Sequence, residues 1–206
     1  EIRTLGAYMF ANTPLESVEI PSTVEHIGSS AFANCSSLKT VALPDSITEI
    51  SDNCFYSCKV LESINLDNII KVGVNAFAYC SAFVNVNLPN LTVMGNGAFF
   101  DCNYLQYASI PKMTYLPENA FRDCTRLEGV SVPLVTRIGK SAFESCNKDD
   151  GLERDFNIEQ ITAIGTDAFR YTGITSVHLY DYIEYGNSCF ELCNYLTEVT
   201  VDSGVD

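Results

Sequence analysis

Phenylalanine recurs along this chain at an almost constant interval. Nine phenylalanines are separated by 22, 23, 22, 22, 22, 22, 26 and 21 residues. They are Phe10, Phe32, Phe55, Phe77, Phe99, Phe121, Phe143, Phe169 and Phe190. A unit of this length is too short to bury its own apolar side, so such units must stack on one another. The repeat therefore predicts a solenoid in which the nine phenylalanines form a single buried column.

Each repeat unit contains one short stretch that is typical of a β-strand. Leu38, Val41 and Leu43 are apolar, and the last two show the period of two that marks a strand with one buried face. Pro44 ends this strand because it has no backbone N–H to donate. The pattern predicts one parallel sheet of about nine short strands, centred on Glu19, Ala42, Asn65, Asn87, Ser109, Ser131, Asn157, His178 and Thr200.

The rest of each unit returns the chain to the next strand. Ile47 and Ile50 are expected to point inward, and the glycine four residues before most of the phenylalanines permits a sharp bend or a close backbone approach. Residues 29–35 have serine near their start and predict a single helical or 3₁₀ turn. We therefore expect a right-handed solenoid with a parallel sheet on one side and short helical turns and irregular segments on the other.

The repeated pattern I-G-x-x-A-F-x-x-C-x-x-L-x-x-V-x-L-P is clearest from Ile27 to Pro44. It resembles the BspA-like class of leucine-rich repeats over residues 5–201. The resemblance implies a leucine-rich-repeat solenoid that is secreted or located at the surface of a bacterium or protist, often as an adhesin. Neither end carries the polar unit that normally caps a solenoid. Residues 1–206 are therefore expected to form a single domain and to be a fragment of a longer chain.

The charge of the chain excludes several classes of partner. There are 26 acidic and 12 basic side chains, which give a formal net charge of −14. This charge repels the phosphates of nucleic acids and of anionic membranes. No apolar run approaches the ~18 residues that a membrane span needs. We expect no nucleic-acid partner and no membrane insertion by this segment.

All nine cysteines fall into two columns of the repeat. Cys54 and Cys189 replace the alanine before the phenylalanine, and the other seven lie three residues after it. Neighbouring cysteines in such a ladder are within disulfide reach, but their Cβ vectors run parallel and their number is odd. No zinc-type spacing accompanies them. We predict a structural ladder of reduced, buried thiols, formed by Cys35, Cys58, Cys80, Cys102, Cys124, Cys146 and Cys193.

The sequence offers little for catalysis or metal binding. His26 and His178 are its only histidines, and no nucleophile elbow, phosphate-binding loop or zinc-protease motif occurs. An insertion at residues 147–155 contains Asp149, Asp150 and Asp155, which could hold a hard cation. Its mixed charge favours a solvated bulge instead, although insertions in solenoids often belong to a binding surface. We predict no enzymatic activity, no catalytic residue, no cofactor and no metal.

A partner is expected to bind the outward side of the predicted strands. Outward positions carry mostly asparagine, serine and threonine, with Tyr107 as a possible anchor. The main hypothesis is recognition or adhesion at the cell surface, with a protein or glycan of a host or neighbouring cell as the ligand. A structural spacer without a ligand is the alternative, and an intracellular scaffold is a third possibility. The predicted partner-binding residues are Asn65, Asn85, Asn87, Tyr107, Ser109, Ser131, Asn157 and His178.

Overall fold

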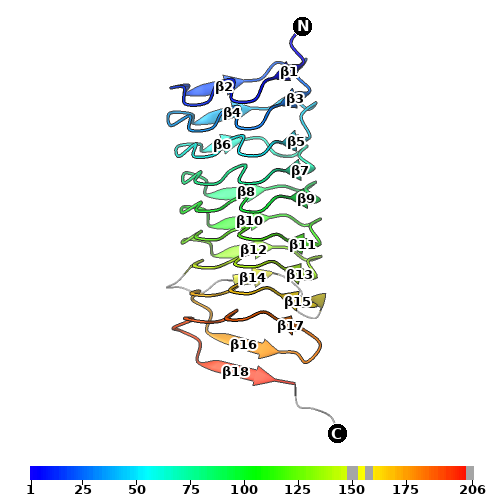
Figure 1. Cartoon of the computed structure of the whole chain (residues 1–206), viewed down its shortest axis with the longest axis vertical. Helices are drawn as coiled ribbons and strands as arrows, with labels where there is room; N and C mark the ends of the chain where they lie inside the picture. The colour runs from blue at the N-terminus through cyan, green and yellow to red at the C-terminus, as the bar shows by residue number, and fades with distance from the viewer. Residues whose placement is uncertain (148–152, 156–159, 203–206) are drawn as a thin grey trace.

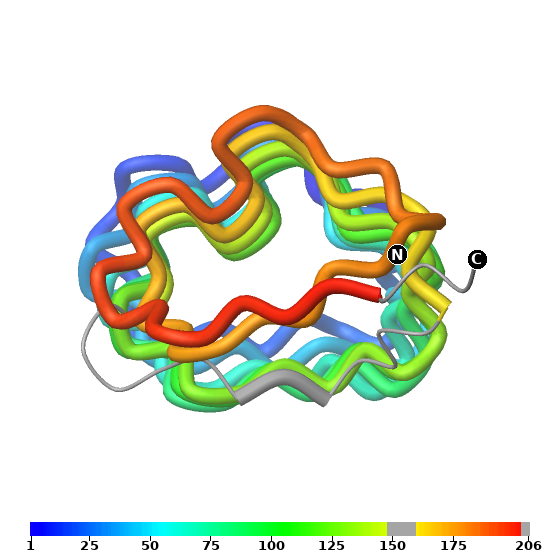
Figure 2. Tube along the Cα trace, turned by 90° about the horizontal axis from the view of Figure 1, so that it is seen from below, coloured from blue at the N-terminus to red at the C-terminus, as the bar shows by residue number. Residues whose placement is uncertain are grey.

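The structure is a computed structural model that describes residues 1–147, 153–155 and 160–202 of the chain. The repeat units form coils that stack along one axis, with the N-terminus at one end and the C-terminus at the other (Figure 1). Viewed along this axis, the coils superpose closely (Figure 2). The predicted parallel-strand solenoid is confirmed.

One side of the solenoid carries the predicted strands, and we call it the strand face. All described strand pairs on it are parallel. The predicted single sheet is divided into three, with strand orders β2-β4-β6, β14-β12-β10-β8 and β16-β18. The strands are β2 (Ser17–Glu19), β4 (Thr40–Ala42), β6 (Ser63–Ile64), β8 (Asn85–Asn87), β10 (Tyr107–Ser109), β12 (Gly129–Ser131), β14 (Glu153–Asp155), β16 (Ser176–Leu179) and β18 (Glu198–Val201).

The predicted register is wrong at β14. The Cα partner of Ser131 is Asp155, and the partner of Gly129 is Glu153. The sequence had assigned Asn157 to the position opposite Ser131 and Asp155 to the position opposite Gly129. Only some of the extra residues in this unit precede the strand, and the others follow it. The length of the insertion does not show how its residues are divided between these two places. Asn157 itself lies outside the described residues.

A second row of two-residue strands runs along the opposite side (Figure 1). The repeat pattern had predicted irregular segments here, apart from inward residues such as Ile50. Glycine is needed beside this row because coils approach closely: a Cβ on Gly28 would lie 2.5 Å from the backbone nitrogen of Ala7. The strands are β1 (Thr4–Leu5), β3 (His26–Ile27), β5 (Glu49–Ile50), β7 (Lys71–Val72), β9 (Val93–Met94), β11 (Tyr115–Leu116), β13 (Arg137–Ile138), β15 (Ala163–Ile164) and β17 (Glu184–Tyr185).

The predicted helical turn around each phenylalanine does not form. In the unit of Phe32, Ser30 and Asn34 have positive φ angles of 57° and 58°. Backbone N–H groups alternate in direction: those of Ser30, Phe32 and Asn34 donate to the next coil at 2.7 to 2.9 Å, while those of Ala31 and Ala33 close turns within their own coil. This segment, which we call the turn face, adds a third ladder of hydrogen bonds between coils.

The nine repeat phenylalanines form one column in the core. Neighbouring rings are stacked, with centroids 5.3 to 5.8 Å apart and planes within 17° of parallel. Seven of them are fully buried, and only the terminal Phe10 and Phe190 are partly exposed. The single buried column predicted from the spacing is confirmed.

Candidate functional site

Five of the predicted partner-binding residues form a continuous patch at the middle of the strand face. In register, Tyr107 lies beside Asn85, while Ser109 lies beside both Asn87 and Ser131. The Tyr107 side chain is 48% exposed, and its hydroxyl donates a hydrogen bond to the Glu128 carboxylate. We call this set the polar patch; its members are Asn85, Asn87, Tyr107, Ser109 and Ser131.

Asn65 is engaged within the protein instead. Its Oδ1 accepts the Leu43 N–H at 2.7 Å, and its Nδ2 donates to the Leu43 carbonyl at 2.9 Å. The amide therefore takes the place of a backbone peptide in the ladder between these two coils. Its side chain is held on the Leu43 backbone, away from the polar patch.

His178 lies on a separate sheet near the C-terminal end, away from the polar patch (Figure 1). Its Nδ1 is 2.7 Å from Thr200 Oγ1, and its Nε2 is 3.0 Å from Asp202 Oδ1. The hydrogen bond from His178 lowers the pKa of the Asp202 carboxyl, and the Asp181 N–H adds to this effect. The cluster joins the last two strands; the predicted strand centres already place His178 beside Thr200, whereas the contact with Asp202 was not predicted.

Two further predictions fall on parts of the chain that are not described. Asn157 and the insertion carboxylates Asp149 and Asp150 lie outside the described residues, and of Asp155 the structure describes the backbone. Within the described ranges, no group of three or more histidine, cysteine, aspartate or glutamate side chains could hold a metal ion.

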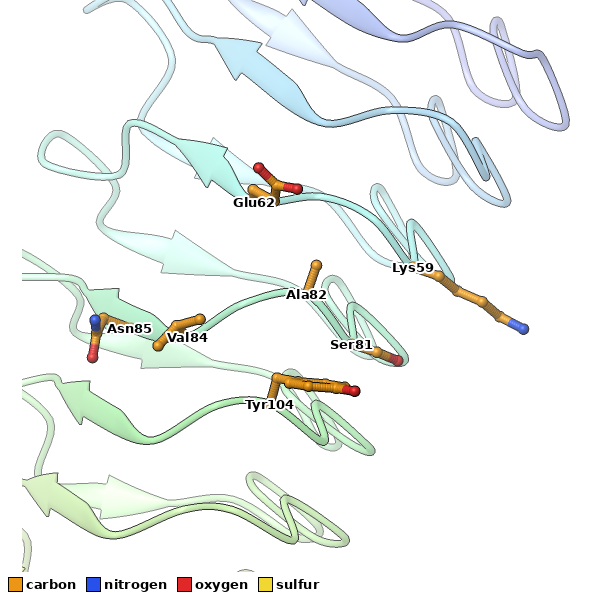
Figure 3. Close-up of a pocket in the computed structure, with 7 residues that line it drawn as sticks. All are labelled: Lys59, Glu62, Ser81, Ala82, Val84, Asn85 and Tyr104. Atoms are coloured by element: carbon orange, nitrogen blue, oxygen red, sulfur yellow. The ribbon is translucent and has the colours of Figure 1, made fainter.

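A groove lies beside the polar patch and shares Asn85 with it. It has a volume of about 620 Å³, within the ~300–1,000 Å³ typical of small-ligand sites. Figure 3 shows that its lining comes from three successive coils. The lining residues are Lys59, Glu62, Ser81, Ala82, Val84, Asn85 and Tyr104.

The groove opens where the strand face is interrupted between β6 and β8. In the coils on either side, the Glu62 N–H donates to the Lys39 carbonyl at 2.9 Å, and the Gln106 N–H donates to the Val84 carbonyl at 2.8 Å. Among the described residues, the corresponding bond from the Val84 N–H to the Glu62 carbonyl is missing, and β6 is not paired with β8. The interruption leaves a backbone donor and an acceptor without a protein partner at the groove.

We attribute the interruption to Phe83. Its ring packs edge-on against Phe77 of the core column, with centroids 5.5 Å apart. Leucine holds this position in the neighbouring units, as Leu61 and Leu105. A phenyl ring is bulkier than the leucine side chain, and its extra volume would push its own strand away from the strand before it.

Most of this groove, and Tyr104 in particular, was not predicted from the sequence. The side chain of Tyr104 is 50% exposed, and the guanidinium carbon of Arg126 lies 4.2 Å from its ring centroid. The signal was present in one column of the repeat, where Ala82 stands between Val60 and Tyr104. A small residue between two large ones leaves a notch in a stacked surface.

The seven predicted ladder cysteines are buried and free, as are Cys54 and Cys189. Each ladder thiol donates to the carbonyl of the phenylalanine in the preceding unit at 3.0 to 3.2 Å; Cys80, for example, donates to Phe55. Burial raises the pKa of the Cys58 thiol to about 12 and that of Cys80 well above its usual value. These thiols are therefore held in their protonated, donating form.

The comparisons with known proteins agree with this architecture. A family model described as the BspA type leucine rich repeat region matches residues 3–128 and 114–206, in six copies. Among curated proteins there is no match. No helix within the described ranges is both long and apolar enough to span a membrane.

Several solved bacterial structures are similar to the chain. A leucine-rich repeat protein from Bacteroides ovatus is 25% identical, with a TM-score of 0.78, covering 98% of this chain and 60% of that one. A leucine rich cell surface protein from Faecalibacterium prausnitzii is 26% identical, with a TM-score of 0.74 and coverage of 97% and 64%. The leucine rich repeat protein of T. pallidum is 28% identical, with a TM-score of 0.65, and the match covers 70% of each chain. The chain thus spans less than two thirds of the first two relatives.

Proposed function

The chain belongs to the BspA-type leucine-rich repeat family, and on this premise we propose that it is a non-enzymatic recognition and adhesion module that binds a protein through its strand face. Proteins with this fold typically act as scaffolds for protein interaction rather than as enzymes. We further propose that the module acts at the cell surface or as a secreted protein. The F. prausnitzii relative is described as a cell surface protein, which supports this location.

The polar patch carries the proposal. Asn85 and Asn87 are exposed on β8, and Tyr107 is exposed on the adjacent β10. Their amide and hydroxyl groups offer donors and acceptors on two strands that pair with each other, and β10 also pairs with β12. An exposed tyrosine on a rigid surface contributes a large contact area at low entropic cost, and tyrosine is enriched among residues that dominate binding energy.

The net charge of the chain indicates which kind of protein surface it binds. With a net charge of −14, the module attracts electropositive protein surfaces and repels acidic ones. The rate of association with its partner should therefore fall as the salt concentration rises.

Cell binding tests the proposal. The fluorescently labelled chain is incubated with cultured epithelial cells and measured by flow cytometry, with the double variant Asn87→Ala/Tyr107→Ala beside it. We expect saturable binding that the variant weakens by at least about tenfold, because each side chain contributes about 1 kcal/mol or more. Treatment of the cells with trypsin should abolish binding if the ligand is a protein.

The matched control changes exposed residues on the second row. Thr92→Ala/Val93→Ala truncates two exposed side chains on β9 and its flank, and it should bind like the wild type. Equal binding by the patch variant would contradict the proposal. Absence of binding to any cell type would favour the spacer alternative.

A further inference from the structure

The groove between β6 and β8 lies where one repeat unit carries a smaller side chain than the units on either side of it. Val60, Ala82 and Tyr104 occupy the same position in three successive units, and Ala82 is the smallest of them. Its methyl group points toward the coil of Glu62 in Figure 3, and its small size leaves room in the groove that a larger residue would fill. Figure 3 shows the Tyr104 ring edge-on beneath Ala82 and Ser81, with one face directed toward the coil that carries them, and Tyr104 lines the groove together with these two residues.

The Tyr104 ring is a pre-organised platform. The Arg126 guanidinium carbon lies 4.2 Å from the ring centroid, and position 126 follows 104 in the same column, so the cation covers the face directed away from Ala82. A cation–π contact holds the ring in place before a ligand arrives. It also satisfies the attraction of the ring for positive charge, so a neutral group fits the open face better than a second cation.

Polar groups of both kinds surround the platform. The Glu62 carboxylate accepts hydrogen bonds, whereas the Asn85 amide and the Ser81 hydroxyl both donate and accept. The unpaired Val84 N–H and Glu62 carbonyl add a backbone donor and a backbone acceptor. Lys59 offsets the charge of Glu62 at the rim, where its side chain points outward (Figure 3).

A ligand for this site needs an apolar face and a rim of hydroxyl groups. The face would stack on Tyr104, and each hydroxyl would donate to one neighbour and accept from another. A phenyl or aliphatic side chain of a protein would also stack, but it would leave Glu62, Asn85 and the open backbone groups without new partners. The number of polar groups around the ring therefore favours a sugar.

We infer that this groove binds one neutral pyranose unit of a glycan, with the open face of Tyr104 as the stacking platform and Glu62, Ser81 and Asn85 as the hydrogen-bonding rim. This deepens the proposed function, because the groove lies within the strand face and adds a glycan subsite beside the polar patch. A glycoprotein ligand could occupy both at once.

Saturation-transfer NMR tests the inference with defined probes. The probes are the methyl glycosides of glucose, galactose, mannose and N-acetylglucosamine, each added in excess to the whole chain. We expect at least one of them to bind with a Kd near the millimolar range that suits a single sugar. Saturation should be strongest on the ring protons of its apolar face.

Two variants locate the binding. Tyr104→Ala removes the platform, and we expect it to weaken binding at least tenfold. Ala82→Tyr fills the notch and should also abolish binding. The matched control Tyr115→Ala removes a similarly exposed tyrosine, 44% against 50% for Tyr104, from β11 on the opposite side and should leave binding unchanged.

Three outcomes would overturn the inference. They are the absence of saturation transfer from all four glycosides, undiminished binding by Tyr104→Ala, and binding of N-acetylphenylalaninamide in place of the glycosides. The last result would make the groove a pocket for a protein side chain. Because Tyr104 is exposed, Tyr104→Ala decides the question even if Ala82→Tyr does not fold. The cell-binding experiment separates this inference from the proposed function. If Tyr104→Ala keeps the trypsin-sensitive binding to cells and Asn87→Ala/Tyr107→Ala loses it, the sugar subsite is refuted and the proposed function is not.

Discussion

At the scale of single residues, two positions in each unit adopt the left-handed conformation. They lie two residues before and two residues after the stacked phenylalanine, as Ser30 and Asn34 do around Phe32. Asparagine, aspartate and serine hold most of these positions, since short polar side chains tolerate positive φ. This explains why the turn face is rich in these residues.

Asn53 tests this explanation. Its φ is 53°, and Asn53→Ala places a Cβ-bearing residue with no polar side chain in that conformation. We expect a loss of about 1 kcal/mol in the free energy of unfolding, measured by guanidinium denaturation. Asn53→Gly, which has no steric cost at positive φ, should stay within about 0.5 kcal/mol of the wild type. Equal losses in the two variants would contradict the conformational explanation.

The burial of the ladder thiols can be measured by chemical labelling. A thiol reacts as its thiolate, and burial raises the pKa of Cys58 to about 12. At mildly alkaline pH, iodoacetamide should therefore leave Cys58, Cys80 and Cys124 unmodified in the folded protein and label them fully in guanidinium. Mass spectrometry of tryptic peptides counts the labels. Labelling of these three cysteines at native rates equal to those of the denatured chain would show that the ladder is open to solvent.

At the scale of elements, the repeat predicted the features that recur in every unit. It did not predict the two-residue strands or the features that depart from the repeat. The phenylalanine column follows from spacing alone, because only stacked coils bury it. The two-residue strands such as β9 were missed, since two residues carry no periodicity. The turn around Phe32 was predicted to be helical because serine is common at helix starts, but serine and asparagine are also common at positive φ. The groove depends on Phe83 and Ala82, which depart from the repeat, and a consensus pattern hides departures.

Phe83→Leu restores the residue type of the neighbouring units. If the phenyl ring separates β6 from β8, leucine should let the Val84 N–H pair with the Glu62 carbonyl. We expect the exchange of the Val84 amide hydrogen to slow at least tenfold, as measured by hydrogen-exchange NMR. The amide of Gln106, which is already bonded to Val84, is the internal control and should change little. Unchanged exchange at Val84 would mean that another residue causes the interruption.

At the scale of the whole molecule, the solenoid is quasi-one-dimensional. Each coil contacts its two neighbours, so stability is the sum of many similar interfaces. The phenylalanine column, the turn face and the two strand rows all run along the same axis (Figure 2). Damage to one coil should therefore cost more in the middle, where it weakens two interfaces, than at an end.

Phe99 and Phe10 provide the comparison. Phe99 is fully buried and stacks on both Phe77 and Phe121, whereas Phe10 is partly exposed and stacks on Phe32. We expect Phe99→Ala to lower the free energy of unfolding by about 3–5 kcal/mol and Phe10→Ala by roughly half as much or less. Chemical denaturation monitored by circular dichroism measures both. A larger loss for Phe10→Ala would contradict the stacked-interface description.

The interruption between β6 and β8 also makes the solenoid mechanically uneven. At this boundary the second row and the turn face are continuous: β5 pairs with β7, and the Phe55 N–H donates to the Ala76 carbonyl at 2.9 Å. Because two sides of the solenoid are hydrogen-bonded across this boundary and the strand face is not, the boundary should resist stretching but bend easily. A pull on an anchored module would bend it here and widen the space above Tyr104, so tension on the protein and occupancy of that space would be coupled.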